Sequence, residues 1–140
     1  MTQPATEQPV RARTVVVVED DPDLQFLTTL MLSRAGYAVR SYGDAREAVP
    51  ACIESPPDAV VLDWMLPGMT GLEALRALRR HPLTAEVPVV MATACDTSDR
   101  VAAALASGAQ AFLGKPFACD ELTGAVAALV EASDRVAAVA

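Results

Sequence analysis

The sequence is poor in cysteine and lysine and contains no long apolar run. Its three cysteines, Cys52, Cys95 and Cys119, form no Cys-x-x-Cys pair, which excludes a zinc knuckle or a disulfide scaffold and favours reduced thiols. The longest apolar stretches are too short to cross a bilayer, and residues 1–13 lack the apolar centre of a signal peptide. These absences predict a cytoplasmic protein that makes no use of a membrane.

The composition predicts one globular domain. Of the 140 residues, 52% are apolar and 21% are charged, which is sufficient for a hydrophobic core. The formal net charge of −7 argues against direct binding of nucleic acid by this segment. We expect residues 1–13, rich in Pro, Thr and Gln, to be a flexible N-terminal tail. Residues 14–132 form the expected domain, and residues 133–140 a C-terminal tail or a truncated linker.

Short apolar runs alternate with helical patterns along the expected domain. The expected strands are residues 14–18, 38–42, 59–62, 87–91 and 111–113. The expected helices are residues 22–35, 44–54, 71–81, 98–107 and 119–132, with Asp21, Asp44 and Thr70 among their N-caps. Strict alternation of strands and helices predicts an α/β fold, a doubly wound five-stranded parallel sheet with right-handed crossovers.

Two local patterns make more detailed predictions about the helices. Asp44 with Glu47, and Thr70 with Glu73, have the spacing of capping boxes. In the first expected helix, the spacing of Leu24, Leu27 and Met31 predicts that these three side chains face the core.

Polar side chains follow four of the five expected strands. They are Glu19, Asp20 and Asp21 after the first strand, Asp63 after the third, Thr93 after the fourth and Lys115 after the fifth. The carboxyl ends of parallel strands share one edge of the sheet, so these groups can converge. Clustered carboxylates repel one another unless a cation lies among them, and oxygen ligands suit Mg²⁺. With a hydroxyl and an amine nearby, the set is suited to phosphoryl transfer to Asp63.

Simpler interpretations exist for several of these residues. Asp63 could be an ordinary turn residue, and the acids after the first strand could only favour a helix N-terminus; we assign Asp21 in that way, as a cap. Phe112 could equally be a core aromatic. For Lys115 the simpler interpretation, an ordinary surface lysine, fits poorly, because the chain has ten arginines and this single lysine. A compact ammonium group is not interchangeable with a guanidinium at a phosphoryl oxygen.

The motifs match a known family in order and spacing. They are Val18-Glu19-Asp20-Asp21, the stretch from Leu62 through Asp63 to Gly71, Met91-Ala92-Thr93-Ala94 and Lys115-Pro116-Phe117. With these four motifs, the sequence resembles the receiver domain of bacterial two-component response regulators over roughly residues 13–132. The resemblance implies the flavodoxin-like, CheY-like sheet with strand order 2-1-3-4-5. The stretch after Asp63 is most similar to the OmpR/PhoB-type subgroup, which carries winged-helix DNA-binding domains.

The resemblance implies a role for each matching residue. Asp63 would accept a phosphoryl group from a phosphohistidine of a sensor histidine kinase or histidine phosphotransfer protein. Mg²⁺, or Mn²⁺ in its place, would be bound by Glu19, Asp20, Asp63 and the backbone carbonyl of Met65. Lys115 would hold a phosphoryl oxygen, and the resemblance implies a cis Lys115–Pro116 bond.

Further implied roles concern the response to phosphorylation. Thr93 and Phe112 match the two switch positions of the family. Their movement would change the binding of a downstream effector, whose identity the sequence does not reveal, at the face of the fourth helix, fifth strand and fifth helix.

Two features depart from the subgroup's pattern. Ala109, Gln110 and Ala111 precede Phe112, and no lysine or arginine occurs between Pro116 and Asp134, so the usual ion pairs of the dimer cannot form. We therefore expect a monomer or a weak, phosphorylation-dependent dimer. The chain also ends in an alanine-rich segment without a DNA-binding motif. We expect a regulator that acts as a single receiver or the N-terminal receiver fragment of a longer response regulator.

Two other functions fit the sequence less well. An aspartyl-phosphate phosphatase would need a second acid two residues after the nucleophile, where this chain has Met65. A flavin or nucleotide carrier would need a phosphate-binding loop, but residues 19–23 are acidic and lack glycine. We therefore expect no enzyme activity beyond the protein's own phosphotransfer and dephosphorylation.

Met65 and Cys95 also predict the lifetime of the phosphoryl group. These apolar residues follow Asp63 and Thr93 by two positions, near the path of an attacking water. We expect slower self-dephosphorylation than in a variant with a polar group there, so Met65→Asn should increase the rate measured after removal of the phosphodonor. An unchanged rate would contradict this expectation.

Overall fold

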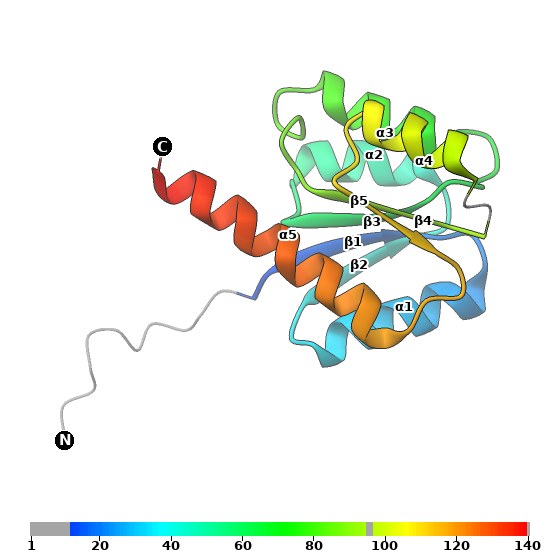
Figure 1. Ribbon diagram of the computed structural model, residues 1–140, viewed down its shortest axis with the longest axis horizontal. Helices are drawn as coiled ribbons and strands as arrows, with labels where there is room; N and C mark the ends of the chain where they lie inside the picture. Colours follow the sequence, from blue (N-terminus) through cyan, green and yellow to red (C-terminus); the bar gives the residue numbers. More distant parts are fainter. Residues whose placement is uncertain (1–11, 95–96, 140) are drawn as a thin grey trace.

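The computed structural model describes residues 12–94 and 97–139 (Figure 1). The strands are β1 (Thr14–Val18), β2 (Ala38–Tyr42), β3 (Ala59–Asp63), β4 (Val89–Thr93) and β5 (Ala111–Gly114). The helices are α1 (Pro22–Arg34), α2 (Ala45–Glu54), α3 (Gly71–Arg80), α4 (Ser98–Ala106) and α5 (Cys119–Val139). Strands and helices alternate, as the sequence predicts.

The strands form one parallel sheet in the order β2-β1-β3-β4-β5. The expected fold class and strand order are thus confirmed. The chain passes to one side of β1 to form β2 and to the other side to form β3, so the topological switch point lies between β1 and β3. Val18 pairs in register with Leu62, and the residues that follow these two are Glu19 and Asp63. The sheet therefore brings these two acids together at its carboxyl edge.

Helices cover both faces of the sheet. Helices α1 and α5 lie on one face, and α2, α3 and α4 lie on the other (Figure 1). Successive residues of β1 alternate between the two cores: Val15 and Val17 pack with the α1–α5 layer, and Val16 and Val18 pack with the opposite layer. Because β1 is buried on both faces, its apolar run is continuous rather than alternating.

Helix α1 turns a partly different side toward the sheet from the one the sequence predicts: Met31 packs against the core as expected, but Leu24 and Leu27 do not. Leu24 and Leu27 are exposed by 39% and 46%, whereas Thr28 and Leu32 are the buried residues of the helix. Residues 28 and 32 form an equally regular helical stripe, and apolar residues occur around most of this helix. The spacing alone therefore did not determine which stripe faces the core.

Two further expectations need correction. Strand β4 covers Val89–Thr93 rather than residues 87–91, since Pro88 cannot donate a ladder hydrogen bond. Helix α5 continues to Val139, so the segment after Ala132 that was expected to be a tail is helical as far as the structure describes it. No intervening glycine or proline interrupts the helix there.

One of the two expected capping boxes is confirmed. Thr70 Oγ1 accepts a hydrogen bond from the Glu73 N–H (3.2 Å), and the Glu73 carboxylate accepts one from the Thr70 N–H (3.1 Å). The capping box expected at Asp44 is wrong, because the Asp44 carboxylate accepts from the Arg46 N–H (2.8 Å) and pairs with the Arg46 guanidinium (2.6 Å). Asp44 still caps α2, but without the help of Glu47.

No helix within residues 12–94 and 97–139 combines the length and the apolar character needed to cross a membrane.

Candidate functional site

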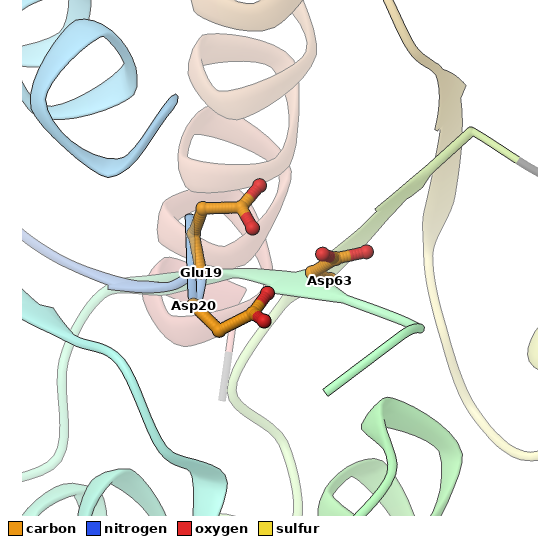
Figure 2. A group of neighbouring side chains, drawn as sticks. All are labelled: Glu19, Asp20 and Asp63. Carbon is orange, nitrogen blue, oxygen red and sulfur yellow. The ribbon is translucent and has the colours of Figure 1, made fainter. Parts of the chain in front are cut away.

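Three carboxylates meet at the carboxyl edge of the sheet. Glu19 and Asp20 follow β1, Asp63 ends β3, and one carboxylate oxygen from each lies within 4.8 Å of the others (Figure 2). Glu19 and Asp63 are only 5% and 6% exposed, and Asp20 is exposed to solvent. Three negative charges at this separation favour a cation, and three oxygen donors with an open side suit Mg²⁺, which retains some of its waters. The residues present thus fit the predicted metal ion.

Lys115 brings the compensating positive charge from β5. Its Nζ forms an ion pair with Glu19 and lies 3.1 Å from Oδ2 of Asp63. The Lys115–Pro116 bond is cis, as the resemblance implied. The Lys115 N–H donates to the Thr93 carbonyl (2.8 Å), which fixes the lysine at the end of the sheet. One ammonium therefore contacts both buried carboxylates.

Burial and the neighbouring charges shift the pKa values of two groups at the site. Burial raises the pKa of Glu19 above the usual glutamate value; the hydrogen bond from Lys115 opposes this shift, and the nearby charge of Asp63 adds to it. Burial by itself lowers the pKa of Lys115, but the hydrogen bond to Glu19 and the charges of Asp63 and Glu19 outweigh burial and raise it. Lys115 is thus held in its charged form.

The loop after β1 is held by α1. The Asp21 carboxylate accepts from the N–H groups of Asp23 (2.9 Å) and Leu24 (3.2 Å), as expected for a cap. The Gln25 side-chain amide donates to the Glu19 carbonyl (2.8 Å). Sequence reasoning missed Gln25, because nothing in the sequence distinguishes it from a solvent-facing residue in the first turn of a helix.

The loop after β3 is held by its own backbone. The Met65 N–H donates to Oδ1 of Asp63 (3.2 Å), so the chain folds back on the carboxylate. The Gly71 N–H donates to the Trp64 carbonyl (2.9 Å). A Cβ on Gly71 would lie 2.1 Å from the Asp63 carbonyl oxygen and 2.7 Å from the Trp64 Cα. Helix α3 therefore begins in direct contact with the backbone of Asp63, a contact that sequence reasoning missed although Gly71 lies in a family motif.

Of the two predicted switch residues, Thr93 lies at the same edge of the sheet, and Phe112 lies within the neighbouring strand β5. Asp63 pairs in register with Ala92, so Thr93 lies one residue beyond it on the neighbouring strand, and Thr93 is fully buried. Phe112 pairs with Met91 and is partly buried against the core under α2, α3 and α4. Their switch roles stay predictions, as does the role of the Met65 carbonyl. Cys95 lies outside the described residues.

Arg100 in α4 also reaches the loop after β3. The guanidinium carbon lies 5.6 Å from the centre of the Trp64 ring, and Nη1 lies 3.4 Å from Sδ of Met65. Sequence reasoning missed Arg100, since no local pattern connects it with residues 35 positions away.

Comparison with known proteins agrees with this geometry. A family model of the response regulator receiver domain matches residues 15–127. The phosphate regulon transcriptional regulatory protein PhoB of Pseudomonas aeruginosa is 32% identical over 118 residues, which cover 84% of this chain and 52% of PhoB. The DNA-binding response regulator MtrA of Mycolicibacterium smegmatis is 40% identical over 114 residues, covering 81% of this chain and 49% of MtrA. The chain thus spans about half the length of these relatives.

Solved structures show the same similarity. A response regulator structure from Chloroflexus aurantiacus superposes with a TM-score of 0.83 at 33% identity, covering 86% of this chain and 99% of that one. A second structure is the receiver domain of the sensor histidine kinase PA1611 from Pseudomonas aeruginosa, solved with a magnesium ion coordinated in its active site cleft. It superposes with a TM-score of 0.81 at 28% identity, covering 86% of this chain and 99% of that one.

Proposed function

The chain belongs to the response regulator receiver domain family, and on that basis we propose that Asp63 accepts a phosphoryl group from a phosphohistidine in a Mg²⁺-dependent reaction. The observation that carries the proposal is the position of Asp63: it ends a buried strand, lies within 4.8 Å of two further carboxylates and lies 3.1 Å from the only lysine. An isolated turn residue would have no such neighbours.

The metal ion in this proposal would be held by Glu19, Asp20 and Asp63. A bound Mg²⁺ supplies positive charge that offsets the negative charge of the incoming phosphoryl group. The receiver of the kinase PA1611, solved with magnesium in its active site cleft, supports the choice of Mg²⁺. Mn²⁺ is the alternative ion, because it has the same preference for oxygen ligands. The carbonyl of Met65 is the proposed fourth protein ligand, two residues after Asp63.

The transfer itself requires little from the protein beyond position and charge. A carboxylate oxygen of Asp63 attacks the phosphorus, the P–N bond to the donor histidine breaks, and the imidazole leaves with the electron pair. Lys115 binds a phosphoryl oxygen, for which its place beside Oδ2 of Asp63 is suitable. The Thr93 hydroxyl moves to donate a hydrogen bond to a second phosphoryl oxygen. Phe112 changes its position in response to the movement of Thr93. With Met65 in place of a second acid, we assign no catalysis beyond the protein's own phosphorylation and dephosphorylation.

The proposed partners follow from this chemistry. The phosphodonor is a sensor histidine kinase or a histidine phosphotransfer protein. The signal leaves through α4, β5 and α5 to a downstream effector, as a shift in the population of two conformations. This face presents Leu105, which is 50% exposed, and the partly buried Phe112. We take residues 14–132 as the receiver unit and keep the proposal of a monomer or a weak, phosphorylation-dependent dimer.

A second proposal concerns the whole protein. Because the chain spans about half the length of DNA-binding relatives such as MtrA, it could equally serve as the N-terminal receiver of a longer response regulator. The receiver chemistry at Asp63 is the same in both proposals.

Asp63→Asn tests the proposed function. After incubation with acetyl phosphate and Mg²⁺, we expect intact-mass spectrometry to show one added phosphoryl group on the wild-type chain. The amide cannot act as the acceptor, so the adduct should be absent in Asp63→Asn, and it should be absent from the wild type with a chelator. Asp120→Asn, an exposed acid of α5, is the matched control and should be phosphorylated normally. An adduct that persists in Asp63→Asn would contradict the assignment.

A further inference from the structure

Arg100 links the start of α4 to the loop after β3, which begins at the proposed phosphoryl site. Met65 belongs to the loop after β3, and Arg100 lies in the first turn of α4, after β4. Strands β3 and β4 are neighbours, and they end at Asp63 and Thr93. The contact between Sδ of Met65 and Nη1 of Arg100 (3.4 Å) therefore links residues that follow these two strands. A phosphoryl group on Asp63 that reaches Thr93 would lie between the ends of the same two strands.

The Met65 side chain depends on this contact for its position. It is 56% exposed, and methionine has three rotatable side-chain bonds, so it is mobile unless other groups hold it. Its backbone is fixed by the hydrogen bond from its N–H to Asp63. Beyond the backbone, Arg100 contacts the sulfur and also lies over the ring of Trp64. The guanidinium thus holds both side chains that directly follow Asp63.

Helix α4 buries little apolar surface within the part of the chain that the structure describes. Ala104 is its buried residue, and Thr97 caps its N-terminus by accepting from the Arg100 N–H (3.4 Å). A small methyl group buries little area, so the contact of Arg100 with Trp64 and Met65 is a substantial part of what holds the start of this helix.

We propose that Arg100 is a positioning residue that holds Met65 beside the phosphoryl site and so prolongs the lifetime of phosphorylated Asp63. The inference rests on the proposed function. In hydrolysis, a water oxygen attacks the phosphorus, the bond from phosphorus to the Asp63 oxygen breaks, and the carboxylate keeps the electron pair. Inorganic phosphate leaves with both protons of the water, as dihydrogen phosphate. The water approaches from the open side of the site, and the inference is that a thioether held by Arg100 obstructs this approach whereas a freely rotating one does not.

The test measures dephosphorylation in a double-mutant cycle. The wild type, Arg100→Ala, Met65→Ala and the double variant are phosphorylated with acetyl phosphate and Mg²⁺, freed of the donor, and followed by intact-mass spectrometry. Loss of a cation–π and sulfur contact of this size should increase the rate about three- to fivefold in Arg100→Ala. Arg100→Lys keeps a cation near Trp64, so its dephosphorylation rate should lie between those of the wild type and Arg100→Ala. Arg76→Ala, an exposed arginine of α3, should match the wild type.

The cycle separates a positioning role from a general loss of structure. If Arg100 acts through Met65, then Arg100→Ala adds nothing in the Met65→Ala background, and the double variant decays like Met65→Ala alone. An additive effect, or an unchanged rate in Arg100→Ala, would overturn the inference. Failure of the proposed function looks different, because the wild type would then take up no phosphoryl group at all.

Discussion

Replacing Lys115 with methionine is expected to strengthen Mg²⁺ binding and, at the same time, to slow phosphorylation. Methionine is an unbranched side chain only one atom shorter than lysine, and it carries no charge. The ammonium now pairs with Glu19 and lies 3.1 Å from Asp63, so it competes with a cation for the same oxygens. Without it, the three carboxylates attract Mg²⁺ more strongly, by about tenfold in affinity.

The same substitution removes the group that would bind a phosphoryl oxygen. Loss of one such charged contact at a preorganised site costs roughly 100-fold in rate. Mg²⁺ affinity can be followed by the fluorescence of Trp64, the only tryptophan and the residue after Asp63. The phosphorylation rate can be followed by intact mass with acetyl phosphate.

Lys115→Arg is the matched control for charge. The guanidinium keeps the positive charge but has a different shape and donor geometry, so Mg²⁺ affinity should stay near that of the wild type while phosphorylation slows. If Lys115→Met bound Mg²⁺ no more tightly than the wild type, the lysine would not compete with the metal. If it were phosphorylated at the wild-type rate, the proposed contact with the phosphoryl group would be wrong.

Among the substitutions proposed for this protein, Gly71→Ala is expected to cause the largest loss of stability. The new Cβ would lie 2.1 Å from the Asp63 carbonyl oxygen, and that oxygen belongs to the backbone of a buried strand and cannot rotate away. Helix α3 must then move off β3, which also breaks the hydrogen bond from Gly71 to Trp64. We expect a loss of about 3 kcal/mol in the free energy of unfolding and a decrease of about 10 °C in the melting temperature.

The chain offers a matched control in Gly124. It lies within α5, and a Cβ there would meet nothing within 4 Å. Gly124→Ala should therefore stabilise the protein by about 0.5–1 kcal/mol, because alanine favours a helix over glycine. Chemical denaturation followed by Trp64 fluorescence measures both variants. If Gly71→Ala unfolded at the wild-type midpoint, the close approach of α3 to β3 would be wrong.

The fold followed from short-range signals in the sequence. The four valines before Glu19 and the apolar run before Asp63 predicted buried parallel strands, since only a strand covered on both faces needs no alternation. The caps at Asp21 and Thr70 marked helix starts, because a capping side chain bonds to N–H groups within three residues. The single lysine, placed after the last strand, was predicted to join the acids at this edge, and the structure brings it to Glu19 and Asp63; its contact with a phosphoryl oxygen stays a prediction.

The sequence by itself therefore determined the order of strands and helices and the polar residue types at or just after the carboxyl ends of the strands. The tertiary structure decided the rest: which stripe of α1 faces the sheet, why residue 71 must be glycine, and that Arg100 reaches Met65. Each of these depends on how two elements approach in space. Gly71 is restricted by the backbone of Asp63, and Arg100 lies 35 residues from Met65. Local propensities act over a few residues, so they leave such contacts open until the sheet and its helices are packed together.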